Sequence, residues 1–251
     1  EEWIVYYKSD AETDWNTQNA TEQSALIEGL DPQTSYSLYV MTDCGTEDNT
    51  DKTQTITFTT PHLSAPMPFF EDFDTDDIVS DIHFVHELGN NRWIVGDSTG
   101  YSQTTQNTEG RSLYISNDSA SYSYQNNSST YTFAYVQVEL SDPELEYNLS
   151  FDYKVPGGEN GWDYLSVYLI DANQVVNSDL YYNSSIPTLL SKKSYVADWT
   201  NFSYTFPHEM IGETKKIVFM WRNDSAGGSN PPAAVDNIHI FSTDCITPHT
   251  I

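Results

Sequence analysis

Gly96-Asp97-Ser98-Thr99-Gly100 has the residue types and spacing of a nucleophile elbow, in which a serine stands between a buried strand and a helix. Such a serine would carry out acyl transfer. The residues after Gly100 are poor helix formers, and no alternation of strands and helices surrounds the motif. We therefore predict that Ser98 lies in a surface turn.

Two segments partly match known metal-binding motifs, but each lacks residues that the motif requires. His83-Phe84-Val85-His86-Glu87 places two histidines three apart, whereas a zincin requires His-Glu-x-x-His on a helix. Asp72-x-Asp74-x-Asp76 has the spacing that opens an EF-hand loop, but Asp77 and His83 occupy the positions where that loop needs Gly and Glu. We expect surface histidines and no EF-hand.

Pairs of carboxylates can hydrolyse glycosidic bonds, and exposed aromatic rings can bind sugars. A glycosidase needs two acids that face each other across about 5 to 10 Å, and nothing singles out such a pair among the 37 Asp and Glu residues. Sugars also stack on exposed rings, although core or edge packing is the alternative for each ring. Seven rings stand in polar, loop-like or strand-edge surroundings: Trp162, Tyr164, Tyr122, Tyr124, Tyr181, Tyr182 and Trp199. We predict ligand contacts from the first four of them.

The composition excludes several classes of partner. Among 251 residues, 10 Lys and Arg face 37 Asp and Glu, which gives a formal net charge of -27. This field repels phosphates and anionic lipid, so we expect no nucleic-acid partner, and it attracts divalent cations. No apolar run approaches the roughly 20 residues that span a bilayer, so we expect no membrane insertion.

The elements that position these residues are strands. Leu30-Asp31-Pro32-Gln33-Thr34-Ser35-Tyr36 predicts a turn followed by a strand, with the tyrosine ring over the turn and its hydroxyl bonded to the backbone upstream. Alternation predicts the neighbouring strands of this first module, which extends over residues 1–61: Trp3–Lys8, a short strand near Asp14–Asn16, Ser24–Ile27, Ser35–Thr42 and Thr53–Thr59.

The first module resembles a fibronectin type III domain from its third strand onward. The resemblance is carried by the strand at Trp3, by Gly29-Leu30-x-Pro32-x-Thr34-x-Tyr36 and by Thr57-Phe58-Thr59-Thr60-Pro61. The first two strands of that family are missing before Glu1. The resemblance therefore implies a sandwich whose core is half open and which is the less stable part of the chain.

A connector at residues 62–67 leads to a longer all-β region at 68–243, which suits a jelly roll. The sequences Leu149–Val155 and Leu165–Leu169 both alternate and flank a Pro- and Gly-containing segment, which predicts a hairpin. The predicted strands are Trp93–Val95, Ser112–Ser116, Tyr131–Leu140, Tyr147–Val155, Trp162–Ile170, Phe202–Phe206, Lys216–Trp221 and Ala234–Phe241.

This second region resembles the MAM-like and cleaved-adhesin jelly rolls of bacterial surface proteins, including the hemagglutinin regions of gingipain-type proteases. Four motifs carry the resemblance in order along the chain: Phe70-Glu71-Asp72-Phe73-Asp74, Gly110-Arg111-Ser112-Leu113-Tyr114-Ile115, Leu149-Ser150-Phe151-Asp152-Tyr153 and Val235-Asp236-Asn237-Ile238. The region lacks the cysteines of animal MAM domains, so an animal-type receptor role is not implied.

The resemblance implies a structural calcium ion where the opening and closing strands meet. Its expected ligands are Glu71, Asp74 and Asp236, with further oxygens from Asn117 and Asp118. Calcium binds six to eight oxygens, and acids gathered in one place repel one another unless a cation lies between them. Solvation of an acidic surface is the alternative explanation for these carboxylates.

Cys44 and Cys245 give neither metal spacing nor a disulfide framework. Residues 244–251 contain Cys245-Ile246-Thr247-Pro248, which resembles the start of another fibronectin type III repeat, and the resemblance implies that each cysteine pairs within a different repeat. A bridge between Cys44 and Cys245 is the alternative and requires their Cα atoms within about 7 Å.

The sequence thus predicts a non-catalytic, adhesin-type binding module of a secreted or cell-surface bacterial multidomain protein. The expected partners are a host or matrix protein or glycan and neighbouring domains of the same polypeptide. The alternatives are a carbohydrate-binding module of a larger enzyme, a jelly-roll glycoside hydrolase or lyase, and a spacer. Eight Asn-x-Ser/Thr sequons fit an exported protein: Asn19, Asn117, Asn126, Asn127, Asn148, Asn183, Asn201 and Asn223.

Overall fold

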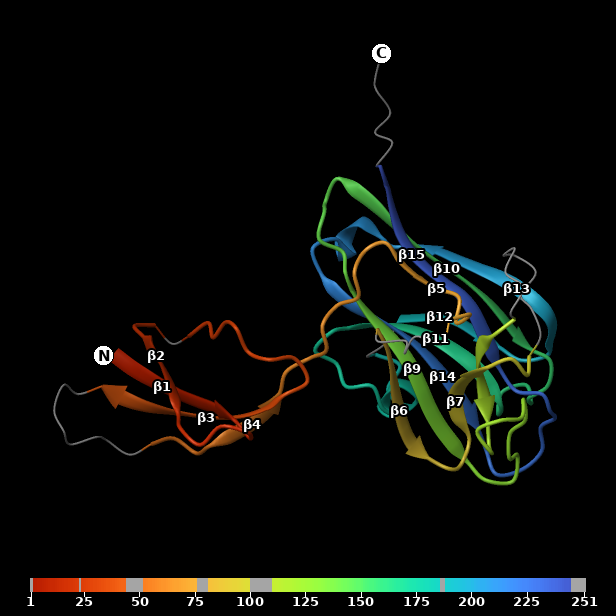
Figure 1. Cartoon of the computed structure of the whole chain (residues 1–251), viewed down its shortest axis with the longest axis horizontal. Coiled ribbons are helices and arrows are strands. Elements are labelled where there is room, and N and C mark those ends of the chain that lie inside the picture. Colours follow the sequence, from red (N-terminus) through yellow and green to blue (C-terminus); the bar gives the residue numbers. More distant parts are fainter. Residues whose placement is uncertain are drawn as a thin grey trace, which may run out of the picture. The chain divides into compact units, whose positions relative to one another are not determined.

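The computed structural model of the chain describes residues 2–22, 24–43, 52–75, 81–99, 110–185 and 188–244. The chain separates into two compact units, Glu1–Leu63 and Ser64–Ile251 (Figure 1). Nearly all regular structure is β-strand; within the described ranges the helices are α1 (Asp179–Tyr182) and a 3-10 turn at His208–Met210. The predicted all-β class is therefore confirmed. Neither of these single turns has the length and apolar character needed to cross a bilayer.

Unit 1 is an antiparallel sheet in the order β2-β1-β3-β4. The prediction of a strand at Ser24–Ile27 is wrong, because this segment is extended but pairs with no strand of the sheet. The last predicted strand is shorter than expected, and the short second strand lies a few residues later. The observed strands are β1 (Glu2–Ser9), β2 (Asn16–Ala20), β3 (Ser35–Asp43) and β4 (Ile56–Thr59).

The predicted tyrosine corner is confirmed. The backbone N–H of Asp31 donates a hydrogen bond to the hydroxyl of Tyr36 over 3.0 Å, and the Tyr36 side chain is buried. Unit 2 repeats the device, since the N–H of Asp142 donates to the hydroxyl of Tyr147 over 2.9 Å. Both turns have the sequence Asp-Pro-x-x-x-Tyr, so the same local pattern closes a turn against a strand in each unit.

Tyr36→Phe is expected to lower the free energy of unfolding of unit 1 by about 1 kcal/mol, because the N–H of Asp31 loses its acceptor. Calorimetry of the full chain would measure this as a lower midpoint for unit 1. Tyr147→Phe is the matched variant and should lower the midpoint of unit 2 instead. An unchanged unit 1 transition in Tyr36→Phe would show that the corner contributes nothing.

Unit 2 is a jelly-roll sandwich of two sheets. One sheet runs β13-β10-β15-β8-β7 with β5 paired to β15, and the other runs β12-β11-β14-β9-β6 (Figure 1). Strands β5, β6 and β12 were not among the predicted strands. The strands are β5 (Phe69–Glu71), β6 (Ile82–Leu88), β7 (Arg92–Gly96), β8 (Ser112–Ser116), β9 (Thr130–Glu139), β10 (Leu145–Val155), β11 (Tyr164–Asp171), β12 (Thr188–Lys193), β13 (Val196–Thr205), β14 (Thr214–Asn223) and β15 (Ala234–Asp244).

The predicted hairpin between β10 and β11 is wrong. β10 pairs with β13 and β15, whereas β11 pairs with β12 and β14 in the other sheet. The segment at 156–163 therefore carries the chain from one sheet to the other instead of closing a tight turn. Alternation had indicated the two strands correctly, but alternation does not specify which strands exchange hydrogen bonds.

Two apolar layers follow from this arrangement. The main core lies between the sheets and includes Phe151, Leu165, Phe219 and Trp221. A second cluster lies on the other face of β9, β11 and β14, so these strands are buried on both faces and read as almost continuous apolar runs. The second cluster comprises Tyr131, Phe133, Tyr135, Tyr164, Tyr168, Ile170, Val176, Leu180, Val218 and Met220.

The domain boundary lies inside the predicted connector 62–67, and the start of unit 2 already belongs to its sandwich. Ala65 is buried and forms a bridge with Val138, while Met67 packs against the core. Cys44, Cys245 and the predicted tail at 245–251 lie outside the described residues, so their pairing stays a prediction.

Candidate functional site

The outer face of the five-stranded sheet gathers aromatic and cationic side chains. Along β11, Leu165 points into the core and Tyr164 points to the outer face, because successive side chains of a strand alternate. Arg222 of β14 stands directly across from Tyr164 in the antiparallel register. Lys192 of β12 stands across from Ser166 on the other side of β11. Three neighbouring strands thus bring two cations to one tyrosine ring.

The rings surround the two cations at short range. The Nζ atom of Lys192 lies 3.8 Å from the centroid of the Tyr164 ring. The Cζ atom of Arg222 lies 5.0 Å from the ring centroid of Tyr181, 5.5 Å from that of Trp162 and 5.7 Å from that of Tyr164. We call Trp162, Tyr164, Tyr181, Lys192 and Arg222 the aromatic–cation cluster.

A hollow of about 200 Å³ lies beside the aromatic–cation cluster. Its floor comes from the sheet, and part of its wall comes from the segment between β11 and β12 that includes α1. The lining combines aromatic, aliphatic and hydroxyl groups with one cation: Tyr164, Tyr168, Leu180, Tyr181, Ser184, Leu189 and Lys192. This combination can stack on an apolar surface and hydrogen-bond to polar groups at its edge.

The segment that forms this wall is held in place at several points. Both the N–H and the hydroxyl of Ser178 donate to the carboxylate of Glu87, over 2.6 and 2.7 Å. The hydroxyls of Tyr131 and Tyr182 lie 2.8 Å apart. Burial, followed by this hydrogen bond, raises the pKa of Tyr131 to about 12, so the phenol stays neutral and can donate or accept.

Trp162 is presented by a loop that is fixed from both sides. The N–H of Trp162 donates to the carbonyl of Glu159 over 3.0 Å, and the N–H of Gly157 donates to the carbonyl of Pro231 over 2.8 Å. Arg222 donates a hydrogen bond to the carbonyl of Trp162. The Trp162 side chain is nonetheless 51% exposed. A large ring is therefore held open to solvent, which costs apolar surface unless something stacks on it.

The four predicted ligand rings divide into two kinds. Trp162 and Tyr164 come together in the aromatic–cation cluster, although Tyr164 is almost fully buried and only lines the hollow. Tyr124 is buried, with its ring against Trp221 and its hydroxyl donating to Asp163 over 2.6 Å, so it serves the core and is closed to a ligand. Its place follows from the loop packing of the sandwich, which the polar neighbours of Tyr124 in sequence do not reveal.

Tyr122 belongs to a different part of unit 2. Its ring packs edge-on against Tyr114, and its hydroxyl donates to the carbonyl of Pro232 over 2.7 Å. Lys154 lies over the rings of both Tyr122 and Trp199, at 5.4 and 4.7 Å from their centroids. Trp199 is on β13 of the six-stranded sheet, so neither ring joins the aromatic–cation cluster.

Arg222 and Lys192 were absent from the sequence predictions. A signal was present for Arg222, because it follows Trp221 on an alternating strand and must face the opposite side from that core residue. Nothing in the sequence places Lys192 beside it, since the contact depends on the pairing of β11 with β12 on one side and β14 on the other.

The acids that the resemblance assigns to calcium are partly brought together. The Asp236 carboxyl is buried, and desolvation, followed by the charges of Asp74, Asp152 and Asp72, raises its pKa to about 7 although its bond to a backbone N–H opposes this. Desolvation also raises the pKa of Glu71, and Asp72 and Asp74 add to it. Over the residues that the structure describes, however, no three His, Cys, Asp or Glu side chains are grouped as metal ligands.

Asn117 and Asp118 lie in an exposed turn after β8. The Asp118 carboxylate is used within that turn, where it accepts hydrogen bonds from Ser116, Ala120 and Ser121. These bonds, led by those from Ser121, hold the pKa of Asp118 well below its usual range. No described contact joins Asn117 or Asp118 to the buried acids, and the calcium prediction therefore concerns Glu71, Asp74 and Asp236.

The serine at 98 and the histidines at 83 and 86, which were expected at the surface, each contact a neighbouring part of the chain. Ser98 is exposed in a turn and donates to the carbonyl of Ala120 over 2.9 Å. His83 packs against Tyr135, and the Nε2 atom of His86 lies 2.8 Å from the carbonyl of Gly89. The two histidines are only partly exposed, because β6 pairs with β9 along its length.

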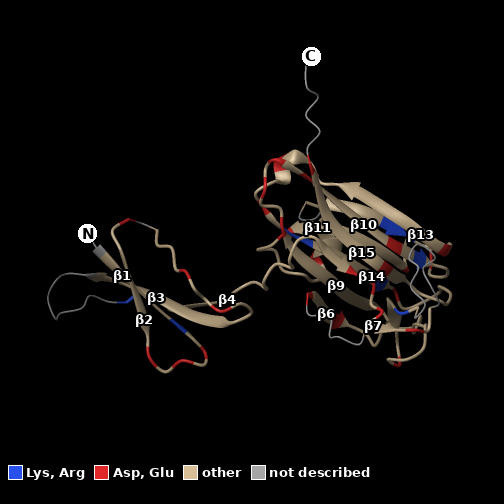
Figure 2. Cartoon of the chain, turned by 45° about the horizontal axis from the view of Figure 1, so that its top comes forward, with Lys and Arg blue, Asp and Glu red and all other residues tan. Residues whose placement is uncertain are grey.

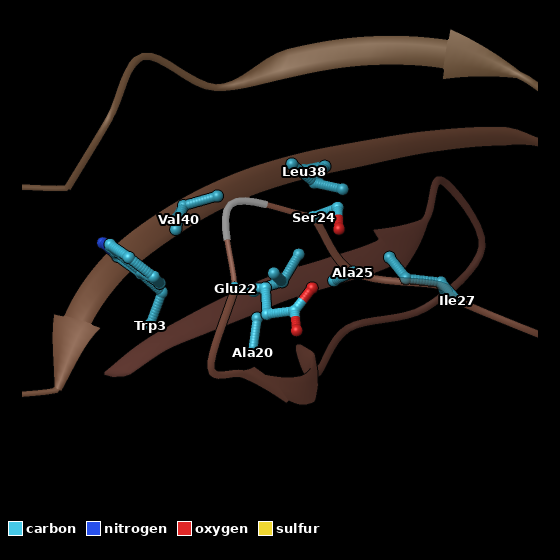
Figure 3. A pocket seen from close by; sticks show the side chains of 9 residues that line it. Trp3, Ala20, Glu22, Ser24, Ala25, Ile27, Leu38 and Val40 are labelled. Carbon is cyan, nitrogen blue, oxygen red and sulfur yellow. The ribbon is translucent and has the colours of Figure 1, made fainter. Parts of the chain in front are cut away.

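A second hollow, of about 320 Å³, lies on unit 1 (Figure 3). Trp3, Leu38 and Val40 of the sheet face Ala25 and Ile27 of the extended segment across it. A mostly apolar sheet face is thus only partly covered. The full lining is Trp3, Val5, Ala20, Glu22, Ser24, Ala25, Ile27, Leu38 and Val40.

The chain matches no protein-family model, and no curated protein matches it. Solved structures that align with it include the enzymatically active domain of tailspike protein 4 of bacteriophage CBA120, with 10% identity over 68% of this chain and a TM-score of 0.41. The alignment spans only 20% of that tailspike chain.

Two carbohydrate-binding modules also align. One is a family 61 module in complex with β-1,4-galactotriose. The alignment covers 65% of this chain and 90% of that chain, with 10% identity and a TM-score of 0.40. The other is a family 11 module from Clostridium thermocellum in complex with a β-1,3-1,4-mixed-linked tetrasaccharide. The alignment covers 68% of this chain and 95% of that chain, with 15% identity and a TM-score of 0.36.

Proposed function

We propose that unit 2 binds a carbohydrate at the aromatic–cation cluster and the adjoining hollow. The observation that carries this proposal is the open Trp162 ring, whose centroid lies 5.5 Å from the guanidinium of Arg222, which in turn lies 5.0 Å from the ring centroid of Tyr181. The apolar face of a sugar can stack on such a ring while its hydroxyls bond to neighbouring cations and phenols.

The size of the hollow favours a sugar over a protein partner. A stable protein interface buries about 800 Å² on each side, whereas the hollow of about 200 Å³ suits a compact ligand. Adhesion to a host or matrix protein stays the alternative, and adhesion to a host or matrix glycan would use the same cluster. The likeness to fibronectin type III and cleaved-adhesin domains, and a secreted or cell-surface location, remain proposals that this function would suit.

Trp162→Ala is expected to weaken glycan binding at least thirty-fold, which corresponds to about 2 kcal/mol for a central aromatic contact. The measurement is affinity electrophoresis of the full chain through gels that contain xylan, galactan, mixed-linkage β-glucan or mannan, or their acidic relatives glucuronoxylan and rhamnogalacturonan. Trp199→Ala is the matched control, because Trp199 also lies under a lysine but on the other sheet.

Retardation by one or more of these polysaccharides, lost in Trp162→Ala and kept in Trp199→Ala, would support the proposal. No retardation of the native chain by any of them would overturn it. Release of shorter sugars during the assay would instead favour the alternative of a glycoside hydrolase or lyase.

We also propose that calcium supports the six-stranded sheet near Asp236. The support is electrostatic: desolvation, and after it the charges of Asp74 and Asp152, raise the pKa of the Asp236 carboxyl, and a divalent cation would offset the repulsion among these acids. Glu71 and Asp74 would bring the opening strand to the ion and Asp236 the closing strand.

A further inference from the structure

Lys192 and Arg222 form a cationic site in a strongly acidic protein. The chain has 10 Lys and Arg against 37 Asp and Glu, and the acids are spread over both units (Figure 2). Lys215 contacts two of them, Asp171 and Glu213. For Lys192 and Arg222, the structure records no ion pair with a carboxylate within the described ranges.

The two cations act on each other instead. Partial burial, and after it the positive charge of Arg222, lowers the pKa of Lys192. Two like charges close to one tyrosine ring raise each other's energy, and the phenol rings around them compensate only in part. An anion bound at Lys192 would reduce this repulsion.

Arg222 also has donor capacity that the protein does not use. Its side chain is 7% exposed, and its Nε–H is buried without a hydrogen-bond partner among the described residues. A guanidinium offers five donors in a fixed plane and binds carboxylates in preference to neutral oxygens. Lys192 is exposed and lines the hollow, so its ammonium group can contact a ligand directly. Arg222 is buried and would act on the ligand through its positive charge.

We propose that the aromatic–cation cluster is selective for a glycan that carries an isolated acidic sugar, such as a uronic acid, whose carboxylate contacts Lys192 beside the Tyr164 ring. This inference rests on the proposed carbohydrate-binding function. The acid should be isolated, because a densely charged polyanion would be repelled by the net charge of -27 over the rest of the chain.

The test compares each acidic polysaccharide with its carboxyl-reduced form, in which the carboxylate becomes an alcohol and the linkages are kept. Glucuronoxylan is the probe with isolated acids, and rhamnogalacturonan, which has an acid on every second backbone sugar, is the more densely charged comparison; both are used in affinity gels with the full chain. The native chain is expected to bind one of the acidic forms at least ten-fold more tightly than the reduced form. Lys192→Met should abolish this difference.

Lys193→Met is the matched control, because it removes the same charge from the next residue, whose side chain points to the other face of β12. It should keep the preference for the acidic form. Equal binding of acidic and reduced forms, or binding of neutral polysaccharides alone, would overturn the acidic-sugar inference while carbohydrate binding stands. Absence of binding to all polysaccharides would overturn both.

Discussion

Asp236→Asn is expected to raise the free energy of unfolding of unit 2 by about 4 kcal/mol at pH 7.5 without metal, and by less than about 1 kcal/mol near pH 4. Burial raises the pKa of Asp236 from its ordinary value of 3.8 to about 7 in the folded chain, and each pKa unit corresponds to about 1.4 kcal/mol. Desolvation is the largest cause of the increase, ahead of the neighbouring acids. Asparagine has nearly the same shape and does not ionise.

The sign follows from proton binding. Because the folded state holds the Asp236 proton more tightly than the unfolded state does, this carboxyl stabilises the fold below about pH 4. That contribution is lost as the pH rises toward 7. The difference in stability between the native chain and Asp236→Asn should therefore grow between pH 4 and 7. Denaturant unfolding at several pH values measures it.

Calcium gives the same experiment a second arm. If calcium binds as proposed, it should raise the melting temperature of the native unit 2 at pH 7.5, a chelator should reverse this, and Asp236→Asn should not respond. Asp198→Asn is the control, because it removes a carboxylate from the same sheet at an exposed position. A native melting temperature that does not respond to calcium or chelator would remove the calcium proposal and leave the pH prediction intact.

Gly157→Ala is expected to destabilise unit 2 by about 3 kcal/mol and to weaken glycan binding with it. A Cβ atom at Gly157 would lie 2.6 Å from the carbonyl carbon of Ser229, 2.8 Å from the carbonyl oxygen of Pro231 and closer still to the oxygen of Ser229. All three are backbone atoms, so the two loops must separate. Since the 156–163 loop presents Trp162, separation would also displace the stacking ring.

Gly161→Ala separates this clash from ordinary backbone strain in the same loop. Gly161 has a φ of +87° but nothing within 4 Å of its added Cβ, so its substitution should cost only about 1 kcal/mol. Denaturant unfolding gives the two stabilities, and the affinity gels give binding. Equal effects of the two substitutions would contradict the close approach of the loops at Gly157.

Local patterns accounted for much of the fold. The strand at Ser112–Ser116 was predicted with its observed bounds, and the tyrosine corner at Tyr36 was predicted with its hydrogen bond to the upstream backbone. Both depend on a few neighbouring residues. Strands β6 and β12 lacked such a signal. β6 exposes apolar Phe84 and Leu88 between polar residues, and β12 ends in two lysines.

The candidate site was predicted only in part for the same reason. Trp162, Tyr164 and Tyr124 were all named from their sequence neighbours as exposed rings, but only Trp162 of the three is exposed; Tyr164 and Tyr124 are both buried, and Tyr164 nevertheless lines the hollow. The prediction that Asp236 and Asp74 are neighbours was what the resemblance implied, and the two acids interact electrostatically in the structure.

The sequence by itself determined that this chain folds as alternating strands, because a period of two and a Pro-containing turn act within a few residues. Only the tertiary structure decided that β10 and β11 lie in different sheets, and that Lys192, Arg222 and Trp162 meet at one ring. Strand pairing joins residues that are tens of positions apart, and it is selected by the burial of the whole sandwich rather than by any local preference.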